Sequence, residues 1–148
     1  MIQPHSGLRA AFVALLMVLF MQPLLATAQV TDINSAINKA GRERMLSQRM
    51  AKAYLFRQMG VNTAEAGSML DAAMKEFAKA HDDLKAAPQS TAQIKSELAL
   101  VEQQWFFFQN ALQMRAATDR VKAASDVGTT SERILEQMDL VVGLYERL

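Results

Sequence analysis

Apolar residues recur every three or four positions in four long segments of the chain, the spacing of one face of an α-helix. In the second segment these residues are Leu70, Ala73, Phe77, Ala80 and Leu84. In the third they are Ile94, Leu98, Val101, Trp105, Phe108 and Leu112, and in the fourth Ile134, Met138, Val141, Tyr145 and Leu148. No segment has the alternation of a strand. Four helices of about 20 residues or more with short connections predict an all-α, up-down-up-down four-helix bundle.

Local signals place the ends of these helices. We expect the first helix from about Asp32 to Met59, ended by Gly60, and the second to open at the capping box 62–65, with sequence NTAE. Residues 86–89 (AAPQ) break the second helix, and the capping box 90–93 (STAQ) starts the third. Residues 129–132 (TTSE) are expected to open the fourth, while the pattern leaves the end of the third undecided between residues 117 and 128.

The first helix differs from the others in having two apolar faces. One comprises Ile33, Ile37, Ala40, Arg44, Ala51 and Leu55, and the opposite one Leu46, Met50, Ala53 and Phe56. Because only one face can pack on the other helices, a two-fold dimer through the first helix is expected, and the small residues Ala40, Ser47 and Ala51 would let two helices approach closely.

Arg44 lies within an apolar stripe and always carries a charge, so it needs a partner there. One interpretation is a carboxylate of the same bundle, for instance on the fourth helix. In the other, two Arg44 side chains meet across the dimer axis and hold a small planar oxyanion between them. Lys39, Arg42 and Arg49 then contribute to the surrounding electrostatic potential. The alternative for Arg42, Glu43 and Arg49 is that they lie off the apolar stripe and, with Arg44, form only a solvated charged face.

The N-terminus has the pattern of a secretory signal. An apolar run from Ala10 to Met21 follows a short polar start, and residues 26–28 (ATA) end it as a small-x-small cleavage site. We expect residues 1–28 to be a signal peptide cleaved after Ala28, leaving residues 29–148 as one exported, periplasmic domain. An uncleaved anchor over residues 10–28 is the alternative.

Charge and composition exclude several functions. Removal of Arg9 with the signal leaves 15 basic and 15 acidic residues, so a nucleic-acid partner is not expected. The absence of Cys excludes disulfides, thiol chemistry and covalent haem attachment. No metal site or catalytic arrangement of residues is found, which predicts a protein that is not an enzyme.

Two further features have a structural and a functional interpretation. The aromatic run 105–108 (WFFF) is expected to be core plus a second packing surface rather than a ligand site. His81 is the histidine that remains after cleavage, and it is expected at the surface or in the core. A non-covalent haem held by His81 and a methionine is the alternative, although we expect no cofactor.

Residues 37–50 (INKAGRERMLSQRM) resemble the signature of the type IV pili methyl-accepting chemotaxis transducer N-terminal domain, the PilJ-type sensor module, also found in nitrate/nitrite sensor kinases. Residues 131–146 resemble the end of that domain. The resemblance implies a dimeric periplasmic sensor bundle, with Arg44 at the nitrate-contacting position and Lys39, Gly41 and Arg49 at positions linked to signalling.

The expected function is therefore sensing of a nitrate- or nitrite-like anion at a dimer interface. The candidate ligand-binding residues are Arg44 first, then Lys39, Gly41, Arg42, Ser47 and Arg49. Because no transmembrane helix or signalling domain follows residue 148, we expect a free binding protein or one that acts on another sensor. The alternative is an interaction protein that binds no ligand and forms a mixed dimer with a membrane-bound sensor.

Overall fold

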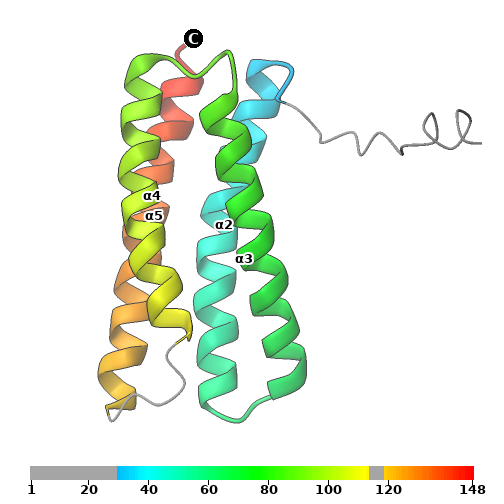
Figure 1. The fold of residues 1–148 in the computed structure, drawn as a ribbon, viewed down its shortest axis with the longest axis vertical. Helices are drawn as coiled ribbons and strands as arrows, with labels where there is room; N and C mark the ends of the chain where they lie inside the picture. Colours follow the sequence, from blue (N-terminus) through cyan, green and yellow to red (C-terminus); the bar gives the residue numbers. More distant parts are fainter. Residues whose placement is uncertain (1–29, 114–118) are drawn as a thin grey trace, which may run out of the picture.

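The computed structural model describes residues 30–113 and 119–148, and within these ranges it contains four long helices. They are α2 (Ile33–Gln58), α3 (Thr63–Ala86), α4 (Ala92–Gln113) and α5 (Arg120–Tyr145). Successive helices run in opposite directions along one long axis, and the C-terminus lies at the end where α2 begins (Figure 1). The up-down-up-down bundle is confirmed. The predicted signal peptide lies outside the described residues.

The ends of α2 follow their local signals. The Asp32 carboxylate accepts a hydrogen bond from the backbone N–H of Ser35 at 2.7 Å and so caps the helix. Met59 is the C-terminal cap, and Gly60 follows with φ of 74°, in the left-handed region that glycine adopts without strain. The predicted range of the first helix is confirmed.

The capping boxes predicted for α3 and α4 do not form as expected. Asn62 has φ of 44° and its side chain makes no capping hydrogen bond, although α3 does begin at Thr63. At α4 the cap is Thr91, whose hydroxyl accepts from the Ile94 N–H at 3.3 Å. The Ser90 hydroxyl instead lies 2.6 Å from that of Tyr145 and donates to the carbonyl oxygen of Leu84.

The predicted start of the fourth helix at residues 129–132 is wrong. Helix α5 begins at Arg120, where the Asp119 carboxylate accepts from the Lys122 N–H at 2.9 Å. The side chains read as a capping box lie within the helix, and the Ser131 hydroxyl donates to the carbonyl oxygen of Gly128. Helix α4 is described as far as Gln113, and residues 114–118 lie outside the described part of the chain.

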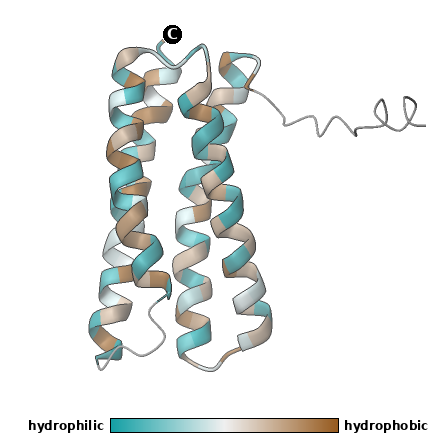
Figure 2. Ribbon diagram, viewed as in Figure 1, coloured by the Kyte–Doolittle hydropathy of each residue, from teal (hydrophilic) through white to brown (hydrophobic). Residues whose placement is uncertain are grey.

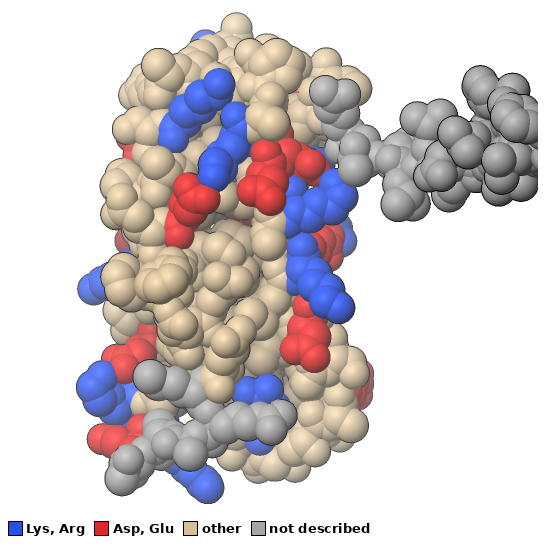
Figure 3. Space-filling model, viewed as in Figure 1, with Lys and Arg blue, Asp and Glu red and all other residues tan. Residues whose placement is uncertain are grey.

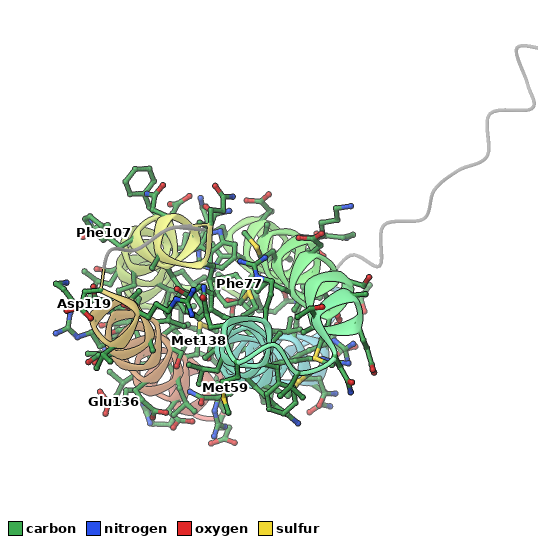
Figure 4. All side chains as sticks on the ribbon, turned by 90° about the horizontal axis from the view of Figure 1, so that it is seen from below. Met59, Phe77, Phe107, Asp119, Glu136 and Met138 are labelled. Atoms are coloured by element: carbon green, nitrogen blue, oxygen red, sulfur yellow. The ribbon has the colours of Figure 1, made fainter. Side chains whose placement is uncertain are left out.

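The core forms where the apolar faces of the four helices meet. Apolar and polar positions alternate along each helix, and Phe77 and Met138 point inward while Phe107 and Glu136 lie on the outside (Figures 2 and 4). Every residue predicted for the apolar faces of α3 and α4 is buried, and so is every one predicted for the fourth helix except Leu148, which lies beyond the end of α5 and is 58% exposed. In the aromatic run, Trp105 and Phe108 are buried and the two residues between them are exposed, so the core assignment is confirmed.

The buried face of α2 combines parts of the two predicted apolar faces, Ala40 and Ala51 from the one with Arg44 and Leu46, Met50 and Ala53 from the other. Its buried residues are Ala36, Ala40, Glu43, Leu46, Ser47, Met50, Ala51, Ala53 and Tyr54. Arg44 lies at the margin of this face, towards α5, with 39% of its side chain exposed. The expectation that Glu43 belongs to a solvated face is wrong, because its side chain is fully buried.

Candidate functional site

Arg44 forms an ion pair inside the chain. Its Nε atom lies 2.6 Å from Oδ1 of Asp139 on α5, whose side chain is 46% exposed. The interpretation in which Arg44 pairs with a carboxylate of the fourth helix is thus confirmed. The contact is not aligned as a hydrogen bond, so the buried Nε has charge compensation but no hydrogen-bond acceptor.

Two further cations of the 37–50 segment are paired with α3. Lys39 Nζ lies 2.5 Å from Asp83 Oδ2, and Arg42 forms an ion pair with Glu76. Burial raises the pKa of Asp83, but the hydrogen bonds from Lys39 and Lys79 outweigh it and leave that pKa below its ordinary value. These cations therefore join α2 to α3.

The other candidates lie on three sides of α2. Ser47 is buried against α5, where its hydroxyl donates to the carbonyl oxygen of Arg44 at 2.8 Å and lies 3.4 Å from that of Ser131. Within the chain, Ser47 thus lies where α2 contacts α5. A Cβ on Gly41 would meet nothing within 4 Å, so packing does not require a glycine there. Arg49 is exposed and forms no ion pair or hydrogen bond with any described residue.

The predicted site residues therefore do not converge on one pocket of a single chain. Lys39 and Arg42 line a shallow hollow of about 720 Å³ on the outer side of α2, and Arg44 is not part of it. A cleft of about 480 Å³ between α3 and α4 contains Arg57 and Lys75 and none of the candidates. On the face seen in Figure 3, basic and acidic side chains are interleaved rather than gathered by sign.

The sequence interpretation missed a buried ionisable pair. Glu43 Oε2 lies 3.2 Å from His81 Nδ1, joining α2 to α3, and the two side chains are 0% and 4% exposed. Burial is the main influence on Glu43 and raises its pKa, against smaller lowering effects of His81 and Lys39. The signal for this pair was the position of Glu43 on the buried arc, seven residues after Ala36 and seven before Met50.

The surroundings of His81 are aromatic. Its ring is stacked with that of Phe77 at a centroid distance of 6.1 Å, and Phe77 lies 4.5 Å from the Trp105 ring. Of the two placements expected for His81, the surface and the core, the structure shows the core. Among the described residues no group of three His, Asp or Glu side chains could hold a metal ion.

Within the described ranges no helix is both long enough and apolar enough to cross a membrane.

The chain matches the family described as PilJ, type IV pili methyl-accepting chemotaxis transducer N-terminal, over residues 25–130. Because the match covers well over half of the 148 residues, the chain belongs to this family. It is accordingly a domain of the sensory and signalling class. The match ends before the C-terminal segment 131–146, whose resemblance to the family stays a prediction. The comparisons with curated proteins and with solved structures gave no match.

Proposed function

We propose that this chain is an exported, periplasmic sensory domain that binds a small oxyanion of the nitrate or nitrite type at Arg44. The observation that carries the proposal is that the Arg44 side chain is ion-paired and still partly exposed to solvent. Arg44 is 39% exposed and lies in residues 37–50, the segment that resembles the family signature and is termed the motif segment below. Its Nε atom contacts Asp139, but the Nε–H has no aligned acceptor. A planar oxyanion can accept hydrogen bonds from a guanidinium in a forked geometry.

Binding would work by exchange of partners. Asp139 compensates the charge of Arg44 in the free protein, and an anion that takes its place would release α5 from α2 at this point. A ligand can shift a conformational equilibrium only by its differential affinity for the two states. Competition with Asp139 supplies such a difference, because the anion binds only the state with the ion pair open.

A second copy of the chain would complete the site. The side of α2 that carries Ile37, Gly41 and Arg44, here termed the Arg44 flank, includes a half-buried isoleucine and a glycine with open space around its Cα. A mid-helix glycine lowers helix stability by about 0.5–1 kcal/mol relative to alanine, and packing within this chain does not require it. Close approach of a second α2 helix supplies a reason for it and brings two guanidiniums towards one anion.

Calorimetric titration of the protein with nitrate, nitrite and chloride tests the proposal. Arg44→Ala should abolish saturable binding of nitrate or nitrite. Arg42→Ala is the matched control. Although Arg42 was a candidate from the sequence, its ion pair with Glu76 and its place in the outer hollow separate it from Arg44, so its removal should leave binding intact. Sedimentation in the presence and absence of the anion reports whether binding accompanies dimer formation.

Absence of binding in folded wild-type protein, or equal loss in both variants, would contradict the Arg44 site. Saturable binding by a monomer would retain the site and refute the dimer. A folded monomer that binds no anion would instead favour the alternative function, a domain that pairs with a membrane-bound sensor.

A further inference from the structure

The Glu43–His81 pair is a two-residue polar site enclosed by the bundle. Both side chains are at least nine-tenths buried, and they make one contact with each other, at 3.2 Å. Their other polar atoms, Glu43 Oε1 and His81 Nε2, are buried and have no hydrogen-bond partner. Such groups stay in a core only if their charges compensate each other, since a lone buried charge is strongly unfavourable.

Charge compensation sets how many protons the pair can hold. With one proton, the pair is either two neutral groups or a carboxylate beside an imidazolium, and its net charge is zero. With none it is a buried anion, and with two it is a buried cation. Because each charged state lacks compensation within the pair, the buried environment favours the state with one proton.

Charged or titratable groups face the pair from every helix. Lys39 on α2 and Asp82 on α3 act on Glu43 with opposite sign, and Lys39 is also ion-paired with Asp83. On the other two helices, Glu102 of α4 is electrostatically coupled to His81 and Tyr145 of α5 to Glu43. Lys39 is already in an ion pair and so only partly compensates a bare Glu43 carboxylate.

We propose that Glu43 and His81 form a buried binding site for a single proton, and that loss of this proton weakens the interface between α2 and α3. Glu43 lies in the motif segment of α2, one turn from Lys39, which joins the same two helices. The site thus makes the packing of α2 against α3 dependent on pH. It is separate from the Arg44 flank, so neither proposal depends on the other.

The sign of the pH dependence follows from the proton that the folded pair keeps. In the unfolded chain the carboxyl and the imidazole have their ordinary pKa values of about 4.3 and about 6.5, so above about pH 6.5 the unfolded pair holds no proton. Because burial raises the pKa of Glu43 in the folded state, this contribution to stability is complete below that imidazole value and is lost as the pH rises towards the folded value. For one proton, the ratio of folded to unfolded protein should fall by up to about tenfold per pH unit.

Urea unfolding followed by circular dichroism, from about pH 7 to about pH 8.5, measures this ratio above the ordinary pKa of histidine and where exposed carboxyls, lysines and tyrosines do not titrate. Glu43→Gln keeps the shape of the side chain but cannot release a proton, so the fall should be lost. The matched control is Glu76→Gln, the same substitution at the half-exposed partner of Arg42, which should keep the wild-type fall.

A wild-type ratio that does not fall across this window, or a fall of equal size in Glu43→Gln, would overturn the proposal. Should Glu43→Gln fail to fold, proton release by the wild-type protein decides the matter. On unfolding in unbuffered solution at about pH 7.5, the proton should appear in the solvent, and its absence would refute the site.

Discussion

If an anion competes with Asp139 for Arg44, removal of the Asp139 charge should strengthen anion binding. Asp139→Asn tests this directly, because asparagine has nearly the same shape and leaves the guanidinium without its counter-charge. The Nε–Oδ1 distance of 2.6 Å shows that the two groups are in contact in the free protein. An anion that competes with Asp139 must therefore break this contact when it binds.

The size of the effect follows from how exposed the pair is. The side chains of Arg44 and Asp139 are 39% and 46% exposed, so water screens their attraction, and such pairs contribute about 0.2–1 kcal/mol. Since about 1.4 kcal/mol corresponds to a tenfold change in affinity, Asp139→Asn should tighten anion binding by between about 1.4-fold and about fivefold.

The assay is calorimetric titration of the variant with nitrate and nitrite at low ionic strength, where surface electrostatics are least screened. Glu76→Gln is the matched control, because it makes the same change of charge and frees a different arginine of α2, Arg42. Affinity should rise in Asp139→Asn and stay at the wild-type value in Glu76→Gln.

Two results would refute the reasoning. Weaker binding by Asp139→Asn would mean that Asp139 orients the guanidinium for the ligand rather than competing with it. An equal rise in both variants would mean that the anion responds to net charge and not to the Arg44 ion pair.

Two further predictions concern the packing of the bundle. Phe77→Ala should destabilise the protein by about 3–5 kcal/mol in urea unfolding, because Phe77 is fully buried and contacts Trp105 on α4. A loss of stability below about 1.5 kcal/mol would contradict this and mean that the neighbouring side chains fill the cavity. Ser90→Ala should destabilise by about 1–3 kcal/mol, because it leaves the buried Tyr145 hydroxyl without its partner. Tyr145→Phe should have a smaller effect of about 1 kcal/mol, because Ser90 keeps its bond to Leu84, and the reverse order in the same assay would contradict this explanation.

The apolar faces of α3 and α4 could be predicted because the evidence for them is local. Residues such as Leu70 and Leu98 recur with the period of a helix, and they are buried whichever helices they meet. The start of α5 was missed because residues 120–130 bury only Ala123 and Val127 and leave Val121 exposed, which is too short an apolar pattern to distinguish from a loop.

The candidate site was only partly predictable. The motif segment and the need of Arg44 for a partner follow from the residues alone, and one of the two partners considered, a carboxylate of the fourth helix, is present as Asp139. The buried acid of α2 is Glu43 rather than a residue of the Arg44 stripe. Its partner His81 lies 38 residues away, on a helix whose rotation is set by packing.

The sequence by itself thus determined the class of the protein, its four helices and most of their buried faces, since helical periodicity and the PilJ signature are properties of neighbouring residues. The tertiary structure decided which side of α2 faces the core, and with it which charges are buried. An apolar face of α2 can pack on its neighbours in more than one rotation. In the observed rotation Glu43 contacts His81 in the core. Arg44 forms its ion pair with Asp139 and remains partly exposed to water.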